Sequence, residues 1–92
     1  MSKKNKASAP TINLKGGDFI HTVPEHLNLE VIIHWKGQVR GKSYTPEHIN
    51  PVHAFAVQDG KFKVINRNLL DTSYTFDLKE VSKVYLMPMG DV

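Results

Sequence analysis

The sequence predicts a mainly β protein, folded as a small barrel or a rolled antiparallel sheet with one or two short helical turns. Short apolar stretches alternate with turn residues along most of the chain, and β-branched residues dominate the longest stretch, Leu29–Trp35. The dipeptide Asp59-Gly60 separates two more apolar stretches, which is a strong hairpin signal. Six or seven short strands of this kind bury a common core best in a closed or rolled sheet.

Residues 1–10 differ from the rest of the chain. They carry Lys3, Lys4 and Lys6 without an acid and with little apolar surface, a composition typical of a disordered basic tail. Residues 11–92 are then the single domain. The chain of 92 residues is 40% apolar, enough for one modest core. A core of this size leaves self-association into a homo-oligomer open.

The first half of the domain contains three predicted strands. Residues 11–14 alternate once and form a candidate edge strand, and residues 19–23 form a second short strand that ends before Pro24. Leu29–Trp35 is the best strand, because its odd-numbered residues are all apolar and share one face. Lys36-Gly37 then forms a turn, after which residues 38–44 return as an antiparallel partner.

A short helical turn is predicted next. Thr45, Pro46 and Glu47 supply a capping hydroxyl, a proline at the first helical position and an acid in the first turn. Pro51 limits such a helix to about one turn. The pentapeptides at 24–28 and 46–50 are nearly identical, and a one-turn helix that ends on an Asn accounts for each, although a duplicated half-unit remains an alternative.

The second half of the domain supplies the remaining strands. Residues 52–57 and Lys61–Asn66 flank Asp59-Gly60 as the two arms of a hairpin. Residues 73–78 and 83–87 are the last two strands, separated by a short turn over residues 79–82. Taken together, these elements predict an SH3-like or Sm-like barrel or roll.

Several classes of protein are excluded by composition. The chain has no cysteine, which rules out a disulfide scaffold, a thiolate zinc site and a cysteine nucleophile. No apolar stretch approaches the roughly 18 residues of a membrane span, and the basic start lacks the apolar region of a secretory signal. The expected location is the cytoplasm, with no membrane partner.

No catalytic or cofactor motif is present. The five histidines lack the spacing of paired zinc ligands, because Pro51 separates His48 from His53, and no glycine-rich phosphate loop occurs. Asp71, Asp77 and Glu80 fit turn and capping roles. The sequence therefore predicts a protein that is not an enzyme and has no metal or cofactor.

Positive charge is concentrated in the tail and in residues 36–67. The second region carries six cations against Glu47 and Asp59, a net charge of +4. Aromatic residues interleaved with cations are typical of single-strand or nucleotide binding. A solvated face without a ligand, with a tryptophan that caps the barrel, accounts for the same residues, and this alternative stays open. The candidate ligand-binding residues are Trp35, Lys36, Arg40, Lys42, Tyr44, Lys61, Lys63 and Arg67.

The order of these residues resembles a WYL domain, a small barrel related to the Sm fold and attached to many bacterial and phage regulators. Trp35 matches the aromatic that ends a strand, and residues 42–49 match the family's Arg-x-Val-x-Pro-x-x-Leu element with lysine for arginine. Residues 60–64 are similar to its Gly-x-Trp-Tyr-Leu strand, and residues 74–81 to its Arg-x-Phe-x-Leu-x-x-Ile element. Lys42 and Tyr74 stand where the family has its binding arginines.

The sequence thus predicts a small non-enzymatic module that binds an anionic ligand, either nucleic acid or a nucleotide, in a regulatory role. The alternative is a protein-interaction module, such as a phage-encoded inhibitor or an accessory subunit, because free edge strands can pair with a partner chain.

Overall fold

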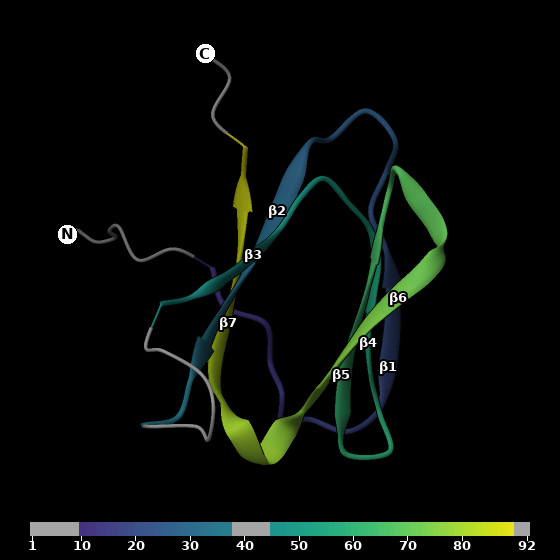
Figure 1. The fold of residues 1–92 in the computed structure, drawn as a ribbon. Coiled ribbons are helices and arrows are strands. Elements are labelled where there is room, and N and C mark those ends of the chain that lie inside the picture. Colours follow the sequence, from purple (N-terminus) through teal and green to yellow (C-terminus); the bar gives the residue numbers. More distant parts are fainter. Residues whose placement is uncertain (1–9, 38–44, 90–92) are drawn as a thin grey trace, which may run out of the picture.

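A computed structural model describes residues 10–37 and 45–89 of the chain. This part of the chain is built from antiparallel strands with one 3₁₀ turn, which confirms the mainly β prediction (Figure 1). The elements are β1 (Phe19–Thr22), β2 (Leu29–Trp35), β3 (Glu47–Ile49), β4 (Val52–Gln58), β5 (Lys61–Asn66), β6 (Leu69–Asp77), η1 (Leu78–Glu80) and β7 (Val81–Pro88).

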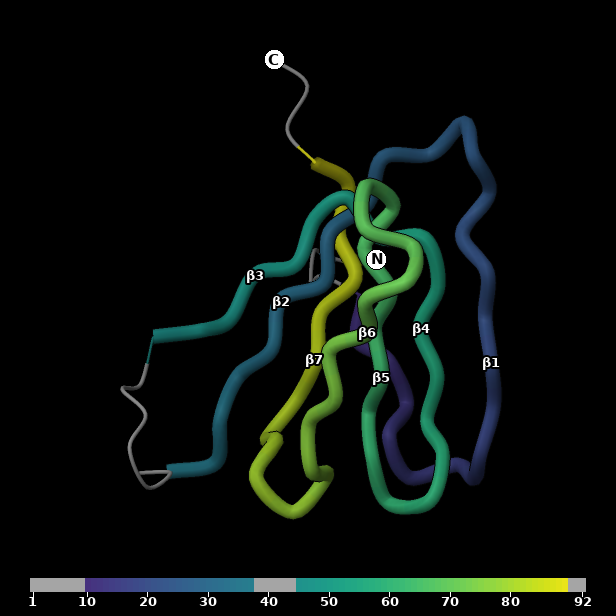
Figure 2. Tube along the Cα trace, turned by 45° about the vertical axis from the view of Figure 1, so that its right-hand side comes forward, coloured from purple at the N-terminus to yellow at the C-terminus, as the bar shows by residue number. Residues whose placement is uncertain are grey.

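The strands form two antiparallel sheets that face each other. One sheet has the strand order β1-β4-β5-β6 and the other β3-β2-β7. The turn η1 carries the chain from the last strand of the first sheet to β7 in the second, at one end of the molecule (Figure 1). Seen from a second direction, the β4–β5 hairpin lies beside β1, and β2 lies between β3 and β7 (Figure 2).

The core lies between the inner faces of the two sheets. Along β2, Val31, Ile33 and Trp35 are buried, while the residues between them are only half-buried. This alternation confirms the predicted face of the strand and follows from the two-residue period of side chains in a β-strand. The fully buried side chains come from both sheets and from the β1–β2 connection; they are Phe62, Ile33, Val23, Val31, Val52, Val64 and Val84.

The predicted hairpin at Asp59-Gly60 is confirmed. β4 pairs with β5 in an antiparallel register that sets Gln58 opposite Lys61. Both turn residues have positive φ, 55° at Asp59 and 75° at Gly60. Two successive residues with positive φ define the turn whose twist matches that of the flanking strands, and Asp-Gly suits it best.

An extended N-terminal segment pairs with the outer edge of β7. Thr11 is bridged to Tyr85, the Ile12 amide donates to the Val84 carbonyl at 2.9 Å, and the Leu86 amide donates to the Pro10 carbonyl at 3.1 Å. The predicted edge strand at residues 11–14 is therefore a shorter pairing of residues 10–12. Pro10 belongs to the folded domain, and the remainder of the predicted tail, residues 1–9, lies outside the described residues.

The predicted helical turn at residues 45–47 is wrong. Glu47–Ile49 is β3, which pairs antiparallel with β2 and sets His48 opposite Ile32. Pro51 leaves too few residues for intrahelical hydrogen bonds, whereas the edge of β2 offers partners for the backbone. The predicted strand at residues 38–44 lies outside the described residues.

The two similar pentapeptides adopt different structures, so the prediction of a one-turn helix is wrong for both. Residues 24–28 form a turn in which the Leu27 amide donates to the Pro24 carbonyl at 3.0 Å. Residues 46–50 run through β3. Tertiary pairing decides between the two conformations, because the local sequence is nearly the same.

Candidate anion-binding site

Five of the eight predicted ligand-binding residues are described, and they do not form one surface. Trp35 ends β2 and Lys36 follows it, whereas Lys61 and Lys63 lie on β5 in the other sheet. Arg67 follows β5. Arg40, Lys42 and Tyr44 lie outside the described residues.

Trp35 is a core residue. Only 8% of its surface is exposed, and its ring centroid lies 5.7 Å from that of Phe76 on β6. Trp35 therefore joins the two sheets and does not present its ring as a platform for a base. The alternative to base stacking was a tryptophan that caps the barrel, and Trp35 is instead part of the core between the sheets.

Lys61 and Lys63 interact with neighbouring strand ends. The Lys61 ammonium lies 3.8 Å from a carboxylate oxygen of Asp77, and the Lys63 ammonium donates to the side-chain oxygen of Gln58 at 3.3 Å. Both pairs are exposed, so each contributes little to stability. Neither lysine is among the residues that line the hollow beside Lys36.

Arg67 links two connections of the fold. Its guanidinium donates to the Leu27 carbonyl at 2.6 Å and to the side-chain oxygen of Asn28 at 3.0 Å. Its own amide donates to the Pro51 carbonyl at 2.9 Å. Two guanidinium bonds directed at one loop indicate a structural role, because they fix the β1–β2 connection against the turn after β5.

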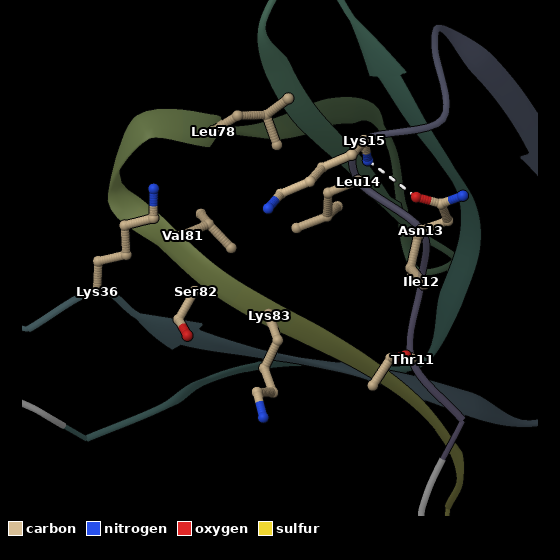
Figure 3. A pocket seen from close by; sticks show the side chains of 10 residues that line it. All are labelled: Thr11, Ile12, Asn13, Leu14, Lys15, Lys36, Leu78, Val81, Ser82 and Lys83. Atoms are coloured by element: carbon tan, nitrogen blue, oxygen red, sulfur yellow. Dashed lines mark hydrogen bonds between the residues drawn. The ribbon is translucent and has the colours of Figure 1, made fainter.

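The lysines that do come together surround a hollow between the N-terminal segment, the end of β2 and the start of β7 (Figure 3). The hollow has a volume of about 660 Å³. Three lysines contribute to its lining, and no acidic residue does. The complete lining is Thr11, Ile12, Asn13, Leu14, Lys15, Lys36, Leu78, Val81, Ser82 and Lys83. We call this site the basic hollow.

Hydrogen bonds fix the main chain at two of the three lysines of the basic hollow. The Lys15 amide donates to the side chain of Asn13 at 2.9 Å, and the Lys36 amide donates to the Glu80 carbonyl at 2.9 Å. Lys83 projects from β7, with its ammonium 5.9 Å from the centroid of the Tyr85 ring. Lys15 extends across the hollow toward the side on which Lys36 lies (Figure 3). Within residues 10–37 and 45–89, no ion pair engages any of the three ammonium groups.

The inner surface of the basic hollow is aliphatic. Leu14, Leu78 and Val81 lie among the lysines, and Ile12 contributes from the same segment as Leu14 (Figure 3). Thr11, Asn13 and Ser82 add uncharged polar groups at its sides. The site therefore combines an apolar interior with the positive charges of three lysines.

The histidines of the described residues do not assemble a metal site. No group of three or more potential ligands capable of holding a metal ion occurs in this part of the chain. His48 instead lies 3.2 Å from the Glu30 carboxylate, which also accepts a hydrogen bond from Asn50 at 3.0 Å. Across the same residues, no helix has the length and apolar character needed to cross a membrane.

Sequence reasoning found Lys36 but missed Lys15 and Lys83. Both lie outside the basic region at residues 36–67, and only the pairing of the N-terminal segment with β7 brings them together. The alternating residues 11–14 were the one available signal. They predicted an edge strand, but nothing in the sequence identified β7 as its partner.

Comparison of this chain with protein-family models, with curated proteins and with solved structures gave no significant match.

Proposed function

We propose that this protein is a non-enzymatic module that binds an anionic ligand in the basic hollow. The observation that carries the proposal is the set of three lysines around a hollow whose lining contains no acid. Like charges gathered without a counter-charge create a local positive potential, which raises the concentration of anions at the site. Aliphatic side chains alone would not select for charge, so the lysines define the class of ligand.

Nucleic acid or a nucleotide is the first class of ligand to test. Phosphates pair well with lysine ammonium groups. Arg40 and Lys42 follow Lys36 closely in the sequence and keep this part of the chain rich in cations. The same charge would also attract carboxylates, so the test compares both kinds of anion.

The first prediction concerns salt. We expect a labelled single-stranded oligonucleotide, measured by fluorescence anisotropy, to bind more weakly as salt rises, with log K falling by about 0.7 per log unit of salt for each contacted phosphate. The double variant Lys36→Gln/Lys83→Gln should lower this slope by about 1.4, because it removes two lysine–phosphate contacts. The matched control is Lys61→Gln/Lys63→Gln, which removes the same charge from β5 and should leave the slope nearly unchanged.

Two outcomes would count against this proposal. An equal loss of binding in both double variants would show that net charge, and not the basic hollow, attracts the ligand. Absence of salt-dependent binding to an oligonucleotide, a nucleoside triphosphate and an acidic peptide alike would reject anion binding altogether.

A second candidate function is protein interaction through β6. This strand is at the end of its sheet, and its residues 69–75 are exposed. The β5–β6 register shifts between Ile65–Ser73 and Asn66–Leu69, and Leu70, which lies within this irregularity, is 58% exposed. An exposed leucine on an edge strand favours contact with another protein. Such an interaction would tolerate salt and the lysine variants but would be lost in Leu70→Glu.

A further inference from the structure

We infer that the ligand of the basic hollow is an extended acidic peptide segment that carries an aliphatic side chain. This inference rests on the proposed function, because it requires that the hollow bind an anion, and it names the chemistry of that anion.

The aliphatic interior of the hollow supports this choice. Leu14, Leu78 and Val81 line the space between the lysines. A sugar–phosphate backbone would cover this surface with polar atoms, whereas a leucine or isoleucine side chain would remove it from water. A ligand that contacts both the aliphatic residues and the lysines therefore has an apolar group close to its negative charges.

The composition of the lining also disfavours a nucleobase. Proteins that bind single strands stack bases on aromatic rings. None of the ten residues that line the hollow is aromatic, and Trp35, the aromatic residue beside Lys36, is buried in the core. The three lysine ammonium groups can donate hydrogen bonds to carboxylates as well as to phosphates.

The edge of β7 indicates an extended ligand. Residues 10–12 already pair with this edge near Val84 and Leu86. The chain then turns at Asn13 and Lys15, and within the described residues no backbone hydrogen bond joins it to β7 beyond that point. Ser82 and Lys83, which line the hollow, are exposed on this edge strand.

A peptide strand can extend the pairing along β7. In an added strand, successive side chains point to opposite sides. One set of side chains would then enter the aliphatic interior while the other approached the lysines. An acidic segment in which apolar residues alternate with Asp or Glu meets both requirements.

The test uses the full-length protein and three labelled probes. The first is a short synthetic peptide of alternating Glu and Leu, the second has Ser in place of each Leu, and the third is a single-stranded oligonucleotide. By anisotropy, we expect the Glu–Leu peptide to bind about tenfold more tightly than the Glu–Ser peptide, since burial of one leucine is sufficient for that difference. Amide signals of Ser82 and Lys83 should shift when the Glu–Leu peptide binds.

Variants test the contribution of the lysines and that of the aliphatic interior separately. Lys36→Gln/Lys83→Gln should weaken both peptides, and Lys61→Gln/Lys63→Gln should weaken neither. Leu14→Ser should remove the preference for Glu–Leu over Glu–Ser, because it deletes part of the aliphatic interior. Dispersed amide signals of each variant confirm that it is folded.

The outcomes distinguish this inference from the proposed function. If the oligonucleotide binds through Lys36 and Lys83 and both peptides bind equally weakly, anion binding stands and the inference is wrong. If the Glu–Leu peptide binds without any shift at Ser82 and Lys83, strand addition is wrong. If no probe binds in a lysine-dependent way, both proposals fail.

Discussion

At the scale of single residues, two cations of the same basic region lie in different surroundings in this fold. Lys36 borders the basic hollow, whereas the guanidinium of Arg67 holds Leu27 and Asn28 in the β1–β2 connection. Residue type alone cannot separate these roles, because both are cations in the same basic region of the sequence. The sequence assigned Arg67 to ligand binding. Its two hydrogen bonds to Leu27 and Asn28 instead indicate a structural role.

Replacement of Arg67 tests its structural role. We expect Arg67→Lys to lower the free energy of unfolding by about 1 kcal/mol, because a lysine ammonium cannot reproduce both guanidinium bonds. Chemical denaturation measures the change, and Lys63→Gln is the control, since its single bond to Gln58 is exposed. If Arg67→Lys is as stable as the wild type but no longer binds the oligonucleotide, Arg67 is a ligand-binding residue and the structural role is wrong.

The turn at Gly60 provides a second test at this scale. Gly60 has a φ of 75°, and a Cβ added there would meet no atom within 4 Å, so the cost of a side chain is purely conformational. We expect Gly60→Val to lower the free energy of unfolding by more than about 1 kcal/mol, because β-branched residues resist positive φ. Thermal unfolding measures this effect, and an unchanged melting temperature would contradict the turn geometry.

At the scale of elements, the sequence predicted strands better than their partners. Leu29–Trp35 and the β4–β5 hairpin follow from residues that are adjacent in the chain, so local patterns are sufficient to place them. The pairing of β3 with β2, and of the N-terminal segment with β7, joins residues far apart in the sequence. The basic hollow depends on the second of these pairings, which is why two of its lysines were missed.

Truncation tests the N-terminal pairing. We expect deletion of residues 1–9 to leave stability nearly unchanged, because every contact described for the segment begins at Pro10. Deletion of residues 1–12 should lower the melting temperature by several degrees, since it removes two backbone hydrogen bonds and the contact of Ile12 with the core. Equal melting temperatures for the two truncations would show that the segment contributes nothing to the fold.

At the scale of the whole molecule, the stability of the domain depends on contact between two sheets. Trp35 is the single tryptophan of the chain, and it touches Phe76 on the opposite sheet. Its environment therefore reports the separation of the sheets, while the backbone signal in circular dichroism reports the strands themselves.

Tryptophan fluorescence tests this arrangement. We expect the native emission to be blue-shifted and poorly quenched by acrylamide, because Trp35 is 8% exposed. Its red shift on denaturation should coincide with the loss of β signal in circular dichroism, as expected for a small two-state domain. A fluorescence transition that precedes the loss of strands would show that the sheets separate before they unfold.

The N-terminal segment has a consequence for affinity. One wall of the basic hollow is formed by residues 11–15, which two backbone hydrogen bonds hold against β7. If this segment detached from β7, the hollow would lose that wall. The apparent dissociation constant of a ligand bound there would then be the intrinsic constant divided by the fraction of molecules in which the segment is attached. Ligand binding must in turn increase that fraction. Under the proposed function, affinity therefore depends on how firmly residues 10–12 pair with β7.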